Sequence, residues 1–241
     1  MSQPVRRRIN VRIPAIGGQG AVSAAHIMAT AADNAGYYAV SNPFYGAEKR
    51  MAPSESYVRI GIEPIYDRGE VVYPDVIMVF HSQVITMGKS NTMPFYSGIK
   101  KNGLIIINTE EDLLTDEDRA FLEERNVKIF NFSATKFALD YVGTELATNM
   151  AMIGAFFGIT QIVDMEPIEE GIKTRFLKKF VVSGGTASLD SAIERKFKKK
   201  LELIEKNIAT ARAAYEFANQ WAKEQGIEPW LPKPEATLQK A

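Results

Sequence analysis

Short apolar runs alternate with longer segments of helical periodicity through residues 8–165. The runs indicate strands, because they are brief and are bounded by Gly, Pro, Asn or Asp. We expect strands over residues 8–16, 37–40, 56–62, 75–80, 104–107 and 127–132. The helical pattern covers residues 21–35, 116–124, 133–142, 149–162, 168–178 and 188–224. Strands that alternate with helices predict a three-layer α/β fold, with a largely parallel sheet flanked by helices.

Two segments follow a different pattern. Residues 41–53 contain Pro43, Gly46 and Pro53 and are expected to form a loop. Residues 188–224 contain neither Gly nor Pro, and a Pro-rich tail with Trp230 follows them. The pattern therefore predicts an α/β domain over residues 1–187 and a C-terminal helical extension with a tail over residues 188–241. Since the tail cannot form a regular helix, we expect it to pack on partner chains.

The composition removes several classes of function. The chain has 29 Lys and Arg against 29 Asp and Glu, so its formal net charge is zero and nothing indicates a nucleic-acid partner. It has no cysteine and two histidines. This excludes disulfides, thiolate zinc sites, a cysteine nucleophile and an iron–sulfur cluster held by this chain alone. We therefore expect no metal site on this chain.

The pattern of the N-terminal residues does not predict a secretory signal. Arg6, Arg7 and Arg8 precede a strand pattern and not the apolar core of a secretory signal. No apolar stretch approaches the ~20 residues that a membrane-spanning helix needs. We expect a cytoplasmic protein without a membrane span.

A glycine-rich turn, Gly17-Gly18-Gln19-Gly20, joins the first strand to the first helix. Glycines allow a tight turn and a close approach of the backbone to a ligand or to another chain, and a helix N-terminus suits phosphate or carboxylate. The dinucleotide fingerprint G-x-G-x-x-G is only partly met, because Ser23 stands at its third glycine. The second strand also lacks the acidic residue that would bind a ribose. A tight turn without any ligand is the alternative interpretation.

Other possible sites are weaker. Gly88-Lys89-Ser90 resembles the end of a phosphate-binding P-loop, but Gln83 stands where that motif begins with glycine, so we interpret Lys89 as a loop lysine. His81 ends a buried strand, where α/β sheets place ligands, and is either a site residue or a loop hydrogen-bonding residue. His26 lies in the first helix and is interpreted as a packing or interface residue. We interpret the charged runs 110–112 and 195–200 as solvated surface.

Several motifs occur together in an order that we recognise. Ala15-Ile-Gly-Gly-Gln-Gly20 is followed by Tyr45-Gly-Ala-Glu-Lys-Arg50 and then by Ser56-Tyr-Val-Arg-Ile60. This resembles the gamma subunit (gamma domain) of the 2-oxoacid:ferredoxin oxidoreductases, the pyruvate:ferredoxin oxidoreductase family, whose pattern is roughly G-x-G-G-Q-G, E-x-R-G-G and V-R-I. Further agreement is found in Asn149-Met150 with Gly154-Ala155 and in Glu205-Lys206-Asn207. The resemblance covers about residues 8–220.

The resemblance implies a non-catalytic subunit of a complex that oxidatively decarboxylates a 2-oxoacid to an acyl-CoA. In such complexes other subunits hold the thiamine diphosphate and the iron–sulfur clusters, and the electrons pass to ferredoxin or another acceptor. For this chain it implies partner subunits of the thiamine-binding and ferredoxin-like kinds. It also implies a possible role in binding coenzyme A through the glycine loop. Glu48 and Arg50 are implied either near the shared cleft or in an inter-subunit salt bridge.

Three departures from the family pattern are visible. Ala15 replaces the first glycine of the first motif, Met51-Ala52 replaces two glycines after Arg50, and Pro53 stiffens that loop. These departures suggest that the chain belongs to a less usual branch of the family, with pyruvate or an aromatic 2-oxoacid such as phenylglyoxylate as substrate. The alternative is a free-standing, Rossmann-like nucleotide-binding protein that acts without partners.

Overall fold

The computed structural model describes residues 6–45, 52–177 and 190–234 of the chain. Within them lies a six-stranded sheet in the order β2-β3-β1-β4-β5-β6. The strands are β1 (Arg8–Ile16), β2 (Tyr38–Tyr45), β3 (Pro53–Gly61), β4 (Val76–Val79), β5 (Leu104–Asn108) and β6 (Lys128–Phe132). Strands β1, β4, β5 and β6 are parallel neighbours, whereas β3 runs antiparallel to both β1 and β2. The expected α/β fold with a mostly parallel sheet is confirmed.

Strand β2 is longer than the sequence pattern predicted. The expected loop over residues 41–53 was wrong for 41–45, which continue β2, and for Pro53, which opens β3. Pro43 stands opposite Ser56 in the antiparallel ladder. Because β2 is the edge strand, it tolerates a proline, which has no N–H to donate to a further strand.

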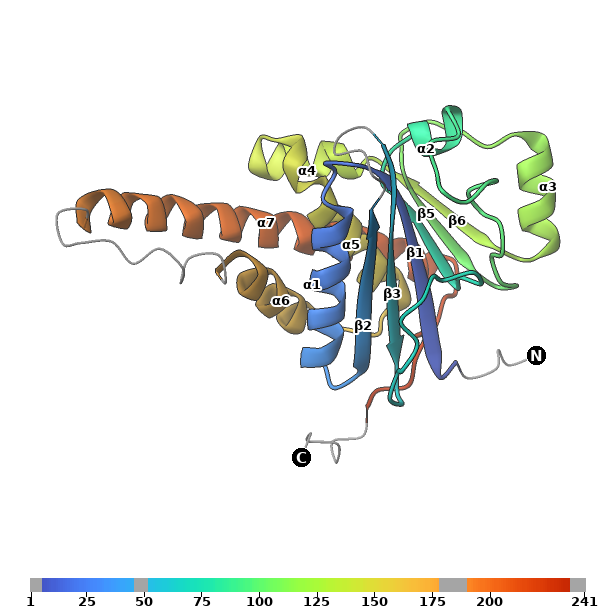
Figure 1. Cartoon of the computed structure of the whole chain (residues 1–241), viewed down its shortest axis with the longest axis horizontal. Coiled ribbons are helices and arrows are strands. Elements are labelled where there is room, and N and C mark those ends of the chain that lie inside the picture. Colours follow the sequence, from blue (N-terminus) through green and yellow to red (C-terminus); the bar gives the residue numbers. More distant parts are fainter. Residues whose placement is uncertain (1–5, 46–51, 178–189, 235–241) are drawn as a thin grey trace.

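Helices cover both faces of the sheet, which gives the three expected layers (Figure 1). One side carries α1 (Ala21–Asn34), α4 (Ala134–Val142), α5 (Thr148–Thr160), α6 (Met165–Leu177) and α7 (Asp190–Glu224). The other side carries the short α2 (Gln83–Thr86) and α3 (Asp116–Glu124), together with a second, smaller hydrophobic cluster. A 3₁₀ turn, Glu145–Ala147, joins α4 to α5.

Helix α5 lies at the centre of the helical layer and is apolar all round. Residues 149–160 are all buried, and they belong largely to a core shared with the sheet and α1. Two glycines on α5, Gly154 and Gly158, face the backbone of α7. A β-carbon at either would overlap a carbonyl oxygen, that of Ala211 or that of Tyr215. Glycine at both positions is therefore what lets the two helices approach so closely.

The C-terminal part of the chain is not separate from the domain. One face of α7 enters the common core through Ile204, Ile208, Ala211, Ala214, Ala218 and Ala222. The expected division at residue 187 therefore does not separate two packing units within the described residues. Figure 1 shows the N-terminal end of α7 extending away from the sheet.

The tail also packs on its own domain. Trp230 is 7% exposed and Leu231 is 2% exposed, both within the main core. The backbone N–H of Trp230 donates to the carbonyl of Thr160 at 2.9 Å, and the hydroxyl of Tyr37 donates to the carbonyl of Pro232 at 3.1 Å. The expectation that the tail packs on partners is therefore wrong for residues 226–234. Prolines prevent a helix, but an extended segment can still pack against the end of α5 and against Tyr37, just before β2.

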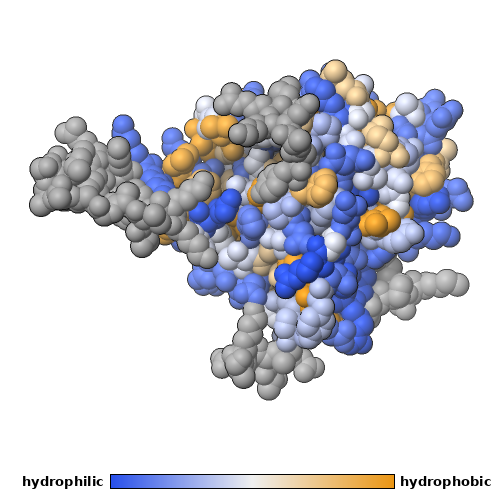
Figure 2. Space-filling model, in the orientation of Figure 1, coloured by the Kyte–Doolittle hydropathy of each residue, from blue (hydrophilic) through white to orange (hydrophobic). Residues whose placement is uncertain are grey.

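On the face seen in Figure 2, apolar surface residues form small separate spots among hydrophilic ones. No helix in residues 6–45, 52–177 or 190–234 is long and apolar enough to cross a membrane.

Candidate functional site

A pocket of about 460 Å³ opens at the carboxyl ends of the parallel strands. It is lined by the glycine loop after β1, by the residues that follow β4, β5 and β6, and by the turn before α5. The chain leaves β1 toward one edge of the sheet and continues from β4 toward the other edge. The pocket therefore lies at the point where the strand order reverses, which is where open α/β sheets bind their ligands.

The glycine loop forms one wall of the pocket, through Gly18, Gln19 and Gly20. Gly18 has φ +104° and Gly20 has φ +77°, a left-handed backbone that favours glycine. A β-carbon at Gly18 would meet no described atom within 4 Å, so the loop leaves open space there. Gly20 caps α1 without a side chain, and the first-turn N–H groups of a helix lack partners within the helix. The local structure thus provides polar N–H groups beside a cavity.

Helix α5 supports this loop from below. The Asn149 Nδ2 group donates to the carbonyl of Gly20 at 3.4 Å, and a β-carbon at Gly20 would lie 2.7 Å from the same nitrogen. Ser23, which stands at the third glycine of the dinucleotide pattern, instead accepts a hydrogen bond from Arg175 of α6 at 3.3 Å. The first contact holds the loop against α5 and the second holds the start of α1 against α6, so Gly20 also has a packing role.

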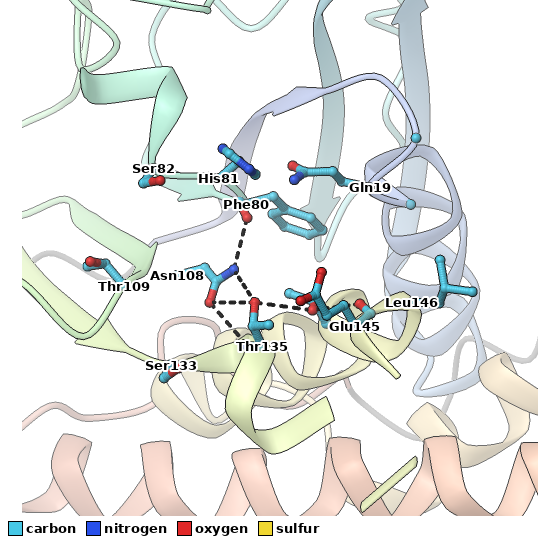
Figure 3. A pocket seen from close by; sticks show the side chains of 13 residues that line it. Gln19, Phe80, His81, Ser82, Asn108, Thr109, Ser133, Thr135, Glu145 and Leu146 are labelled. Atoms are coloured by element: carbon cyan, nitrogen blue, oxygen red, sulfur yellow. Dashed lines mark hydrogen bonds between the residues drawn. The ribbon is translucent and has the colours of Figure 1, made fainter. Parts of the chain in front are cut away.

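Asn108 organises the opposite wall of the pocket. Its side-chain nitrogen donates to the carbonyl of Phe80 and to the hydroxyl of Thr135, both at 3.0 Å, and its oxygen accepts from the backbone N–H of Thr135 at 3.2 Å (Figure 3). One amide therefore joins the ends of β4 and β5 to the start of α4. The hydroxyl of Thr148 lies 3.4 Å from that of Thr135 and donates to the carbonyl of Glu145 at 2.7 Å.

His81 follows β4 and also lines the pocket (Figure 3). Its Nδ1 accepts a hydrogen bond from the backbone N–H of Gln83 at 3.1 Å, so the proton of the neutral ring lies on Nε2. Burial, and then the nearby charge of Lys89, lower the pKa of His81 below its usual value of 6.5. The imidazole is consequently neutral at pH 7. Lys89 itself lies in a loop, as expected, and donates to the Gln83 side chain at 3.0 Å.

The lining combines hydroxyl and amide groups with little charge. Among the described residues that line the pocket, none is Lys or Arg, and Glu145 is the sole carboxylate. The side-chain nitrogen of Gln19 and the hydroxyls of Ser82 and Ser133 have no hydrogen-bond partner among the described residues. These groups can therefore bind a neutral polar ligand such as an amide without first breaking a bond inside the protein.

The two charged residues expected at the site, Glu48 and Arg50, lie outside the described residues. Gly17 lies beside the pocket-lining Gly18, and its N–H donates to the carbonyl of Ala52 at 2.9 Å. Ala52 is the first described residue after that segment. Gly18, Gln19 and Gly20 thus line the pocket, Gly17 lies beside it, and a cofactor-binding role for these four residues and for Glu48 and Arg50 stays a prediction.

The strand order argues against a dinucleotide site of the Rossmann kind. In that fold the second strand lies beside the first and carries an acidic residue for the ribose. Here β3 separates β2 from β1, so the end of β2 does not border the glycine loop. Residues 38–45 contain no Asp or Glu in any case.

Residues 10–185 match the pyruvate ferredoxin/flavodoxin oxidoreductase family. The chain belongs to this family. The match contains the glycine loop and every described residue that lines the pocket.

Relatives within this oxidoreductase family cover most of the chain. The common subunit gamma of the pyruvate/ketoisovalerate oxidoreductases of Pyrococcus furiosus is 35% identical over 208 residues, which are 86% of this chain and 96% of that protein. The pyruvate synthase subunit PorC of Methanothermobacter marburgensis is 34% identical over 168 residues, which are 70% of this chain and 86% of that protein.

The fold agrees with a solved member of the family. The crystal structure of pyruvate oxidoreductase subunit PORC from Thermotoga maritima is 28% identical, with a TM-score of 0.61. It covers 88% of this chain and 97% of its own. The family resemblance expected from the glycine loop and the two later motifs is confirmed.

Sequence reasoning missed most of the polar wall of this pocket. Asn108 ends β5, Thr109 follows it, and Ser133 and Thr135 lie within three residues of the end of β6, at the same sheet edge as His81. The rule that selected His81, a polar residue at the carboxyl end of a buried parallel strand, would also have selected them. Ordinary polar residues after a strand are common, and only the strand order shows that these four converge.

The remaining candidate residues have structural roles or lie at the surface. His26 binds Ser41 of β2 through its Nδ1 at 3.0 Å, in agreement with a packing role. Residues 110–112 are exposed, as are Lys198 and Lys199. Among the described residues no cluster of three or more His, Asp or Glu is arranged to hold a metal ion.

Proposed function

We propose that this chain is the gamma subunit of a complex that oxidatively decarboxylates a 2-oxoacid to an acyl-CoA and passes the electrons to ferredoxin or another acceptor. The observation that carries the proposal is the alignment with a gamma subunit from Pyrococcus furiosus over 96% of that protein's length. Thiamine diphosphate and iron–sulfur clusters supply the decarboxylation and electron-transfer chemistry from other subunits. The absence of cysteine from this sequence supports that division of labour.

Within this function, we propose that the pocket beside the glycine loop receives part of coenzyme A. A cavity of about 460 Å³ without Lys or Arg among its described lining residues does not suit the phosphates of coenzyme A. The partnerless groups of Gln19, Ser82 and Ser133 suit the two amides of its pantetheine arm, which need both donors and acceptors. The chain's contribution would be to hold and orient that arm, and Arg50 would supply charge for the phosphates. Contact of the glycine loop with a partner chain alone is the alternative.

A kinetic comparison tests the coenzyme A proposal. In the reconstituted complex, Gln19→Ala and Ser133→Ala should raise the KM for coenzyme A several-fold. They should leave the KM for the 2-oxoacid unchanged, because the only hydrogen bond lost within the described residues is the long one, 3.5 Å, from the N–H of Ile16 to the Gln19 side chain. Thr86→Ala, in α2 and outside the pocket lining, is the matched control. An unchanged KM for coenzyme A in both pocket variants would leave the loop as a contact for a partner chain.

The identity of the 2-oxoacid is a separate proposal. The Pyrococcus furiosus relative is a common subunit of pyruvate and ketoisovalerate oxidoreductases, which supports the idea that a gamma chain does not select the substrate. We propose pyruvate as the substrate of this complex, with an aromatic 2-oxoacid such as phenylglyoxylate as the alternative suggested by Met51-Ala52. Comparing kcat/KM of the purified complex for the two acids decides between them.

A further inference from the structure

A second pocket lies at the opposite end of the sheet from the glycine loop. Its volume is about 540 Å³, and it is formed by the start of β1, the end of β3 and the segment 67–73. Its lining includes four cationic side chains, Arg8, Arg59, Arg68 and Lys100. The lining of the glycine-loop pocket shares no residue with it.

The most buried of these cations, Arg59, is only partly satisfied. It is 5% exposed, and its Nη2 donates to the carbonyls of Gly69 at 2.8 Å and Glu70 at 2.9 Å. Its Nε and Nη1 atoms have no hydrogen-bond partner among the described residues. The three N–H bonds on these two atoms thus lack an acceptor, on atoms that each have less than 1 Å² of accessible surface. Buried polar groups are rarely left in this state, so the arrangement points to an acceptor supplied from outside the chain.

The charges around Arg59 are mostly engaged with one another. Arg8 pairs with Asp67 at 2.5 Å, and Lys100 pairs at 3.0 Å with Asp75, which is not one of the lining residues. Burial and then repulsion by Arg8 lower the pKa of Arg59, which agrees with a cation that lacks a partner of its own. With Glu70 included, four cations face three carboxylates, so one positive charge remains. A single carboxylate balances this charge better than a doubly charged phosphate does.

The rim of the pocket is apolar and exposed. Val72 is 58% exposed and Tyr73 is 67% exposed, and both line the pocket. Tyr66, next to the lining residue Asp67, is 85% exposed. Tyrosine and arginine are enriched at the energetic centres of protein interfaces, where an apolar contact surrounds a desolvated polar anchor. A partner protein, which can present a carboxylate surrounded by apolar side chains, therefore suits this pocket best.

We propose that this second pocket docks a partner subunit, which inserts an acidic side chain against Arg59 and packs apolar side chains on Val72 and Tyr73. The inference rests on the proposed function as a subunit of a complex. It assigns the end of the sheet remote from the glycine loop to assembly, and so separates the subunit contact from the proposed coenzyme A contact.

Assembly of the complex from purified subunits tests the proposal. Arg59→Met keeps most of the side-chain volume and removes the charge. It should weaken association of this chain with its partner subunits by at least tenfold and reduce the dependence of that association on salt. The control is Arg212→Met, a half-exposed arginine of α7 paired with Glu169, which should associate like the wild type. Association can be measured by biolayer interferometry at two salt concentrations.

A second variant keeps the test decisive if Arg59→Met does not fold. Tyr73→Ser changes an exposed side chain, so it should leave the melting temperature unchanged and weaken association several-fold. If the wild type assembles and both folded variants associate with wild-type affinity, the docking proposal is wrong and Arg59 is hydrated by water only. If the wild-type chain does not assemble with thiamine-binding and ferredoxin-like subunits at all, the proposed function fails and the docking site fails with it.

Discussion

The backbone N–H of Trp230 donates a hydrogen bond of 2.9 Å to the carbonyl of Thr160, the last residue of α5. This bond joins the C-terminal segment to the central buried helix. The side chain of Trp230 is stacked by the guanidinium of Arg6, whose carbon lies 3.7 Å from the ring centroid. Both ends of the described chain therefore meet at one point of the core.

Removing the side chain of Trp230 should destabilise the isolated chain. We expect Trp230→Ala to lower the free energy of unfolding by about 3–5 kcal/mol, because a buried aromatic side chain leaves a cavity. Glu228→Ala, two residues earlier and exposed, should change it by less than about 0.5 kcal/mol. Urea denaturation of both variants measures the difference. Equal stability of Trp230→Ala and wild type would show that the tail does not pack on its own domain in solution.

The contact between α5 and α7 should tolerate no side chain at Gly158. A β-carbon there overlaps the carbonyl oxygen of Tyr215 and lies 3.1 Å from the backbone nitrogen of Asn219. Gly158→Ala should therefore force the helices apart and cost about 2–3 kcal/mol. Gly69→Ala is the control, since a β-carbon at Gly69 meets open space. A melting temperature for Gly158→Ala equal to that of the control would contradict this packing.

Stability should fall as the pH drops below neutrality. Burial lowers the pKa of both His26 and His81 below 6.5, with help from Arg175 and Lys89 respectively. As the pH falls through 6.5, the unfolded chain binds protons that the folded chain does not yet bind, so the folded state loses stability. The free energy of unfolding should be higher at pH 7.5 than at pH 5.5.

The double variant His26→Asn/His81→Asn tests whether these two histidines cause the pH dependence of the unfolding free energy. Asparagine keeps a polar group near the position of each Nδ1 and does not titrate. The difference in unfolding free energy between the two pH values should shrink in the double variant. If this difference is as large in the double variant as in the wild type, other titratable groups cause the pH dependence.

Replacing Glu55 even by glutamine, its amide analogue, should lower the free energy of unfolding. Glu55 is buried on β3, where one carboxylate oxygen accepts from Ser90 at 3.2 Å and from the N–H of Thr92 at 2.9 Å. The other oxygen accepts from the Tyr57 hydroxyl at 3.0 Å. Glu55→Gln places an NH₂ group against a donor on one side and should cost about 2 kcal/mol. Glu63→Gln removes only an exposed pair with Arg7 and serves as the control, with an expected change near zero in the same denaturation assay.

Local sequence signals correctly predicted those elements whose conformation depends on residues nearby in the sequence. The glycine loop, the start of α3 at Asp116 and the buried runs of β4 and β5 depend on neighbours within a few residues. Thr115, just before α3, accepts from the N–H of Asp118, in a reciprocal capping box. Such signals can be read without knowledge of the strand order.

The features that were missed depend on residues far apart in the sequence. Pro43 argued for a loop, but pairing with β3 at the edge of the sheet holds it in a strand. The tail looked like an unsupported segment because its partners lie far away in the sequence: Tyr37 is 195 residues before Pro232, and Thr160 is 70 residues before Trp230. Asn108 and Thr135 became recognisable as a pair only once β5 and β6 were known to be neighbours.

The position of Trp230 and Leu231 in the core also constrains when the protein can fold. Both pack in the same cluster as Ile9, near the beginning of the chain, and as the central helix α5. During synthesis, α5 emerges with apolar side chains on every side well before the residues that complete its surroundings. The nascent chain therefore carries an incomplete core until residue 231 has left the ribosome.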